Sequence, residues 1–343
     1  MDKSSAGAFT FAKASGNLGR SFIADRAQIL FEQKSLGELW SLLFKSPLPL
    51  VPEVLLAEKI EIEAFSKFFS DYASFVSTYD KPSAILTDQL CIYEAENLKV
   101  ILSALANKEN DMPSLVDLGD FATCHYEAWP NLAQITAGTH FDWLKDLPSE
   151  HEQEKLEYKL DIQVVQHLWK SIQKYTGESK EGLIRLFKEE DINKNIVWAL
   201  RLRIYYKMDK EQILNHLIYV NEAPNLEDPI AAPAIIILDF PLDEIGPWEK
   251  WKYKDYVNPH FAGAIWKIDP AWIEKIGKSK LNKLALNLFH QYPMTDCSLL
   301  GWFKIKEYEL SCIRTAVESI RLNINPEDAM KALNLIADGG TNA

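Results

Sequence analysis

The chain has 343 residues, enough for one large domain or two to three smaller ones with a substantial buried core. Its formal net charge of −12 argues against nucleic-acid binding, which needs a basic surface, and opposes binding to an anionic membrane unless basic residues are clustered locally. The excess of acidic residues is best explained by solubility.

The start of the chain carries no export signal. Residues 1–16, MDKSSAGAFTFAKASG, contain no apolar run long enough for a signal peptide. The longest apolar run, 230–238, is too short to cross a bilayer and contains Pro233. The four cysteines have no CxxC spacing, which favours reduced thiols over disulfides or a zinc site. We expect a soluble, cytosolic protein that reaches any membrane through partners.

Helical patterns follow one another along the first third of the chain. Residues 8–31 place apolar side chains at helical spacing, and Ser35 and Glu38 have capping-box spacing before a short amphipathic helix. Prolines then break the chain before a long helical pattern at 53–77, and another follows at 92–108. Period-two alternation is scarce and no Asn-Gly hairpin occurs, so we predict an all-α fold.

The sequence repeats itself at a nearly fixed spacing. Residues 58–69 match residues 158–169 at an offset of 100, and Asn97-Leu98 recurs as Asn195-Ile196 at an offset of 98. A third helix of similar character, 308–324, follows after a step longer by about twenty residues. Chance similarity among amphipathic helices is the alternative. We predict three helical units, 1–110, 111–210 and 211–325, and a C-terminal tail at 326–343.

The helix predicted over 191–206 is apolar nearly all round, with only a narrow stripe around Lys194 and Arg201 left for solvent. Such a helix is covered by other elements on several sides. Arg203 shares a sector with apolar residues, where an unpaired guanidinium would be costly. We expect Arg203 to meet a carboxylate or to line a polar cavity.

The extra length of the third unit lies in residues 222–272. Seven prolines prevent this stretch from being one helix, and it holds four of the ten tryptophans. Such a density of aromatic residues suggests a packed Ω-like loop or an interface. The simpler interpretation is that the stretch folds over the core of the third unit itself. The final residues, 339–343, are expected to be disordered.

The sequence contains no complete catalytic motif. Gly277-Lys278-Ser279 lacks the leading glycine and the strand of a phosphate-binding loop, and His151-Glu152 lacks the second histidine of a zinc-protease helix. The seven histidines show no metal-ligand spacing, and His167 is predicted to be a satisfied core or boundary residue. We therefore expect a binding or structural protein without cofactor or metal, rather than an enzyme.

Three segments carry a resemblance to a known family. ENLKVIL at 96–102, NIVWALRLRIYY at 195–206 and FKIKEYELSCIRTAVESI at 303–320 look like the C subunit of A/V-type rotary ATPases, which corresponds to subunit d of the eukaryotic vacuolar enzyme. The opening at 11–31 is similar to the start of bacterial members. The resemblance covers almost the whole chain and is weakest across 222–260.

The resemblance implies a funnel of three helical units around a pseudo-threefold axis. One copy would sit on the cytoplasmic face of the membrane-embedded proteolipid ring, with the central-stalk subunits D and F docked in its socket. Torque would pass through it between nucleotide chemistry in the soluble head and ion transport in the membrane. The subunit would make or break no bond. The transported ion, H⁺ or Na⁺, and the direction of ATP turnover depend on other subunits.

Two sets of residues become hypotheses for partner contacts. Polar residues on the helices that close each unit would line or brace the socket; they are Asn97, Lys99, Asn195, Arg201, Arg203 and Arg314. Caps and ion pairs within the subunit are the alternative for these six residues. The aromatic residues Trp248 and Trp251 would face the proteolipid ring.

Two functions of other classes remain as rivals. A free-standing helical-repeat scaffold would not associate with the proteolipid ring. A helical enzyme would bring carboxylates or histidines together in a deep pocket.

Overall fold

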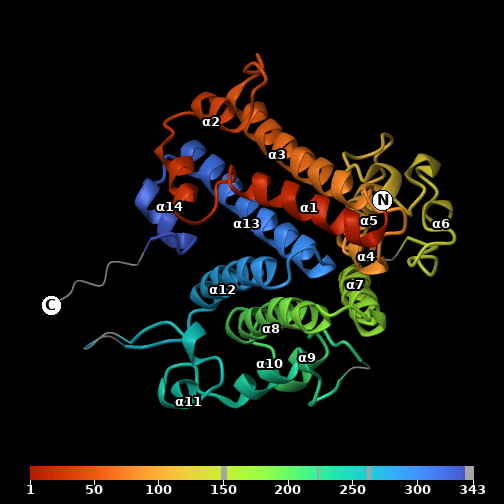
Figure 1. Cartoon of the computed structure of the whole chain (residues 1–343). Helices are drawn as coiled ribbons and strands as arrows, with labels where there is room; N and C mark the ends of the chain where they lie inside the picture. The colour runs from red at the N-terminus through yellow and green to blue at the C-terminus, as the bar shows by residue number, and fades with distance from the viewer. Residues whose placement is uncertain (148–152, 222–223, 261–262, 264, 337–343) are drawn as a thin grey trace.

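A computed structural model of the chain describes residues 1–147, 153–221, 224–260, 263 and 265–336 (Figure 1). Within these ranges the regular structure is helical throughout, with fourteen α-helices, five 3-10 helices and no β-strand. The prediction of an all-α fold is confirmed. None of the helices in these ranges combines the length and the apolar character that a bilayer-spanning segment needs.

Six long helices form the frame and follow one another as three pairs. The pairs are α3 (Glu53–Val76) with α5 (Cys91–Ala106), α7 (Gln153–Lys174) with α8 (Lys180–Ile204), and α12 (Pro270–Gln291) with α13 (Asp296–Arg321). The second helices end at residues 106, 204 and 321, which are 98 and 117 residues apart. These spacings equal those of the sequence repeat. The unit boundaries and the pseudo-threefold funnel stay predictions.

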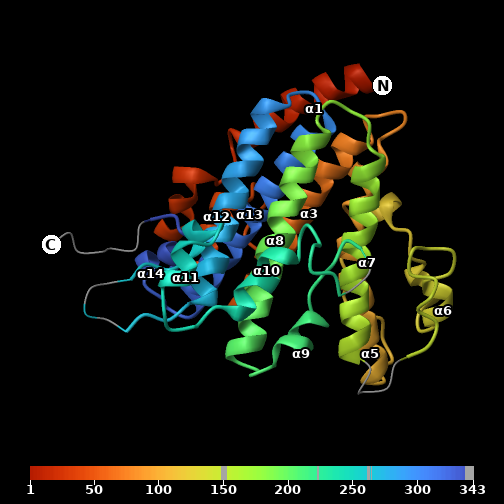
Figure 2. The same cartoon turned by 90° about the horizontal axis from the view of Figure 1, so that it is seen from below.

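Each long helix packs against the next, and the last packs back against the first (Figure 1, Figure 2). Contacts join α5 to α7, α7 to α8, α8 to α12 and α12 to α13, while α13 lies along α3. Within the first pair, the rings of Phe65 on α3 and Tyr93 on α5 meet edge to face with centroids 5.1 Å apart. The six helices therefore form a closed circuit.

The closing contact between α13 and α3 is aromatic. The fully buried ring of Phe303 on α13 lies 4.9 Å from that of Phe68 and 4.7 Å from that of Tyr72, both on α3. Trp302 stacks on the same two side chains. Full burial of each such ring contributes about 1.5–3 kcal/mol, so this contact is a major source of stability.

Elements outside the three pairs cover one side of α13 and α3. They are α1 (Lys3–Leu18), η1 (Ala24–Glu32), α2 (Leu36–Leu43), α4 (Ala84–Asp88) and α14 (Pro326–Ala332). The helical pattern at 8–31 is split into α1 and η1, because the chain turns after Leu18 and Ala24 adopts a positive φ of 49°. The capping box is present in altered form. The Ser35 hydroxyl accepts a hydrogen bond from the Glu38 backbone amide, while the Glu38 carboxylate accepts one from the backbone amide of Lys34 instead of Ser35.

The remaining elements are short and join the long pairs. They are η2 (Gly119–Phe121), η3 (Tyr126–Ala128), α6 (Leu132–Ile135), α9 (Lys210–Leu214), α10 (Ala232–Ile236), η4 (Ile237–Asp239), α11 (Gly246–Glu249) and η5 (Lys254–Tyr256). The segment 326–343 begins with α14, and residues 339–343 lie outside the described residues.

The stretch 222–272 packs mainly against the second pair of long helices. Its α10 and η4 lie against α8, and its buried tryptophans share one apolar core with Ile196 and Leu200 of α8. Only Ile273 and Ile276 of α12 join this core from the third pair. Because α8 also contacts α7, α12 and α13, it is covered on nearly every side, as its apolar sequence predicts.

Asn97 and Asn195 make the same pair of hydrogen bonds in their respective helix pairs. The side chain of Asn97 donates to the Val116 carbonyl and accepts from the Val116 amide, both at 2.8 Å. Asn195 does the same with Ile218, at 2.8 and 2.9 Å. Each buried amide group thus holds the segment that follows its helix. The corresponding position of α13 is Cys312, which lacks an amide group.

The second helices of all three pairs also end alike. A residue two or three positions past each end has a left-handed backbone, with φ of 56° at Lys108, 56° at Lys207 and 52° at Asn323. This conformation lets the next amide reach back to a carbonyl of the last turn, as Glu109 does to Ala104.

Replacing Asn195 with alanine should lower the free energy of unfolding by about 2–4 kcal/mol, because the partly buried amide and carbonyl of Ile218 and the buried carbonyl of Ile230 lose their partner. Urea titration followed by circular dichroism measures the change. Asn107→Ala, at an exposed position, is the matched control and should change stability by under about 0.5 kcal/mol. Equal effects of the two substitutions would contradict a structural role for Asn195.

Candidate functional site

Helices from all three pairs enclose a central cavity of about 310 Å³. Apolar side chains of α7 and α8 form part of its wall. Its charged residues come from α5, α7, α8 and α13; they are Glu96, Lys99, Asp161, Glu190, Asp191, Lys194 and Lys304. A cavity of this size holds a few side chains or a small ligand, and is too small for a protein helix.

Lys304 of α13 is the most deeply buried charge of the cavity, with 3% of its side chain exposed. Its Nζ lies 2.9 Å from a carboxylate oxygen of Glu190 and 2.9 Å from one of Glu307. Burial alone would lower the pKa of the Lys304 ammonium, but the two carboxylates raise it above its ordinary value. Lys304 is therefore charged, and it joins α13 to α8.

The charges of α8 complete this network. Lys194 lies 2.9 Å from Glu190 and 3.5 Å from Asp191. Burial opposes ionisation of Glu190, but Lys194 and Lys304 together hold the pKa of its carboxyl below the ordinary value. Asp191 has only the longer contact with Lys194, so burial dominates and raises the pKa of its carboxyl.

Lys99 of α5 forms the outer part of the charged wall. Its Nζ lies 2.6 Å from Asp161 of α7 and 2.8 Å from Glu96, and 20% of its side chain is exposed. Burial raises the pKa of the Asp161 carboxyl, although Lys99 opposes the shift. Every carboxylate of the cavity wall thus has a lysine partner.

Three of the six residues predicted for the socket form ion pairs between consecutive helix pairs. The pairs are Lys99 with Asp161 at 2.6 Å (α5 to α7), Arg201 with Glu274 at 2.5 Å (α8 to α12), and Arg314 with Glu61 at 3.0 Å (α13 to α3). We call these three contacts the seams. At each seam the base lies on the second helix of one pair and the acid on the first helix of the next.

Two of the seams use corresponding positions of the repeat. Glu61 and Asp161 are the residues that match at an offset of 100, and Lys99 and Arg314 lie two positions after Asn97 and Cys312. The third seam is displaced by one helical turn, because Val197 occupies the position that corresponds to Lys99. An ion pair between the second helix of one pair and the first helix of the next is therefore found at all three seams.

The other three predicted residues bond within the chain. Asn97 and Asn195 are buried. Arg203 donates to the carbonyls of Ile237 and Phe240, at 3.2 and 2.7 Å, instead of to a carboxylate. Of the six predicted residues, Lys99 alone lines the central cavity.

Trp248 and Trp251 are buried, with 0% and 5% of their surface exposed. Trp248 donates its indole N–H to the Pro241 carbonyl, and the two indole rings meet edge to face. Both side chains belong to the core beside α8, and their contact with the proteolipid ring stays a prediction.

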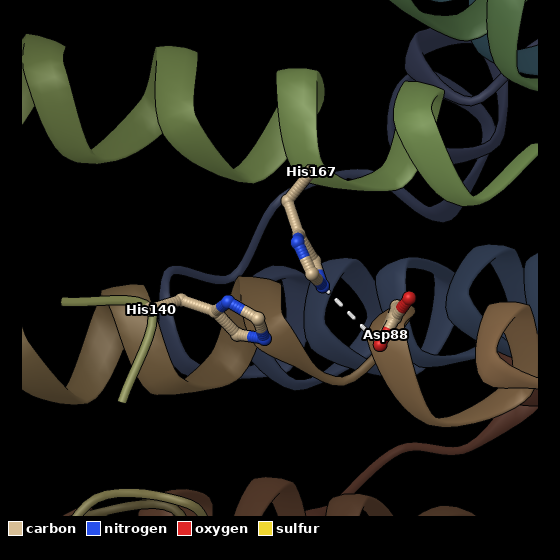
Figure 3. Close-up of side chains that lie close together, drawn as sticks. All are labelled: Asp88, His140 and His167. Atoms are coloured by element: carbon tan, nitrogen blue, oxygen red, sulfur yellow. Dashed lines mark ion pairs between the residues drawn. The ribbon is translucent and has the colours of Figure 1, made fainter. Parts of the chain in front are cut away.

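The sequence did not single out Lys304 or Asp161 as site residues, although the repeat paired Asp161 with Glu61. It also missed a cluster of Asp88, His140 and His167 (Figure 3). The two histidines are 27 residues apart, and no local spacing connects them. The four cysteines are free and buried, and burial raises the pKa of each thiol, which suppresses nucleophilic reactivity.

Replacing Asp191 with asparagine should stabilise the protein relative to the wild type increasingly as pH rises from 4 to 7. Because the folded-state pKa of Asp191 is raised, its contribution to stability is present below about pH 4 and is lost as pH rises through the folded pKa. Urea titrations at pH 4, 5, 6 and 7 measure this difference. The exposed Asp243→Asn is the control. A difference that falls with pH would contradict the raised pKa.

Comparisons with known proteins agree with the helical plan. Residues 24–332 match the family described as ATP synthase (C/AC39) subunit. A protein of Treponema pallidum (strain Nichols), described as uncharacterized, is 25% identical over 320 residues, which cover 93% of this chain and 94% of that protein. Because the family match spans nearly all of the frame, from η1 to α14, the chain belongs to the family of C subunits of A/V-type rotary ATPases.

Proposed function

We propose that this chain is the coupling subunit of the rotor, joining the central-stalk subunits D and F to the proteolipid ring on the cytoplasmic face of the membrane. In this role it transmits torque between ATP turnover in the soluble head and proton or sodium transport in the membrane, as one copy per complex. The observation that carries the proposal is the family match over residues 24–332.

The closed circuit of helices supports a mechanical role. Torque that passes through a protein puts force on the contacts between its helices. At each seam this contact runs between two long helices that pack side by side. An exposed ion pair adds only about 0–1 kcal/mol of stability. Resistance to shear therefore depends mainly on apolar packing, such as that of Phe303 between Phe68 and Tyr72, while the ion pairs fix the register of the helices.

The chemistry of the cavity favours this role over that of an enzyme. Its carboxylates are neutralised by lysines, and the described residues of its wall include no cysteine, serine or histidine that could act as a nucleophile. A free-standing scaffold remains distinguishable by experiment, because it would not bind the ring.

Deleting the gene in the native host should abolish ATP-driven ion uptake by inverted membrane vesicles, while the detached soluble head keeps hydrolysing ATP. Adding back the purified chain should restore uptake. The tagged chain, recovered from gently solubilised membranes, should bring down the proteolipid ring with subunits D and F. A clean monomer, recovered from membranes that contain those subunits, would favour the scaffold.

Exchanging the charges of one seam tests whether Lys99 braces the subunit. Lys99→Glu should reduce both thermal stability and capture of purified D and F, because it places three acids together at the cavity. The double variant Lys99→Glu with Asp161→Lys restores an opposite pair and should recover both properties. If stability recovers and capture does not, Lys99 contacts the stalk directly.

A further inference from the structure

Three potential metal ligands from three separate segments meet beside α7 (Figure 3). Asp88 is the last residue of α4, His140 lies between α6 and α7, and His167 is on α7. One carboxylate oxygen and one nitrogen from each ring all lie within 4.8 Å of one another. The ring centroids of the two histidines are 3.8 Å apart.

Other side chains of α7 hold two of these residues in place. Gln163, one turn before His167, donates its amide N–H to the His140 carbonyl. Ser171, one turn after His167, donates its hydroxyl to Oδ2 of Asp88. The other oxygen of Asp88, Oδ1, is thus left to face His167 Nε2 at 3.2 Å. Such outer partners orient the ligands of metal sites in proteins.

The burial of the cluster also suits a metal. The side chains of Asp88 and His167 are 16% and 20% exposed, while His140 is exposed. A hydrogen bond between Asp88 and His167 would account for those two residues alone. It gives no reason for a second imidazole ring to lie with its centroid 3.8 Å from the first.

We propose that Asp88, His140 and His167 bind one Zn²⁺ ion. Two imidazole nitrogens and one carboxylate oxygen form a donor set that zinc accepts, and a water molecule would complete the tetrahedron. Magnesium and calcium prefer oxygen ligands throughout, so they fit this set poorly.

The distances fit this geometry. Ligands about 2.0–2.2 Å from a tetrahedral zinc ion are about 3.3–3.6 Å from one another. The 3.2 Å between His167 Nε2 and Asp88 Oδ1 is already close to this value. His140 lies in a loop and needs to move by only about 1–1.5 Å to complete the site.

Zinc at this site would cross-link two helix pairs. Asp88 belongs to the short helix that leads into α5, and α4 itself packs on α7. The ion would therefore join the first and second pairs near the seam formed by Lys99 and Asp161. This inference concerns the stability of the chain and does not depend on its role in the rotor.

The test uses the full chain, stripped of metal by EDTA and dialysed at pH 7.5. Titration with ZnCl₂ in a calorimeter should show one equivalent bound, and saturating zinc should raise the melting temperature by mass action. MgCl₂ at the same concentration should do neither. His140→Ala should weaken zinc binding by about 100-fold or more, since it removes a direct ligand.

The His140 substitution lies at an exposed loop position, so it tests the site even if Asp88 or His167 variants fail to fold. His290→Ala, at an exposed position on α12, is the matched control and should leave zinc binding unchanged. Equal zinc affinity of the wild type and His140→Ala, or no rise in melting temperature with zinc, would overturn the proposal.

Discussion

The packing of α13 against α3 is the contact on which the rest of the frame depends. Contacts between neighbours in chain order give a row of long helices, and the contact of α13 with α3 joins the last of them to the first. It is made by Phe303 and Trp302 between the aromatic rings of α3. Lys304, the next residue, faces the cavity and binds Glu190 of α8. Three consecutive residues of α13 therefore join the first, second and third pairs.

The repeat in the sequence is reflected in the chemistry of the seams and helix ends. Asn97 and Asn195 each hold the segment after their helix, and each second helix is followed by a left-handed residue. The positions that break the pattern are also informative. Cys312 occupies the position of the asparagine in α13, and the seam at Arg201 has moved by one turn. The three pairs thus share one plan, and the third pair lacks the asparagine.

Sequence reasoning recovered the helical class, the long helices and the spacing of the pairs, because apolar periodicity and capping residues are local signals.

The contacts between distant residues were not recovered. The sequence placed Arg203 against a carboxylate or in a polar cavity, whereas in the structure Arg203 donates to the carbonyl of Ile237 and to the carbonyl of Phe240. The stretch 222–272 was expected over the third unit and lies against α8. Composition shows that aromatic residues are dense in this stretch, but not which helix they pack against. The network of Lys304 and the cluster at His167 depend on residues far apart in the chain, and a single sequence does not reveal such contacts.

The closing contact has a consequence for synthesis on the ribosome. Glu309 binds the amide of Phe22, a residue 287 positions earlier, and α13 covers the apolar face of α3. While the intervening residues are being made, at about 5–20 residues per second, α13 is not yet present to cover that face. The nascent protein therefore exposes aromatic surface for many seconds, and the order of its helices makes the last long helix to emerge the one that protects the first. Such a chain places a demand on cellular chaperones that its compact final form does not reveal.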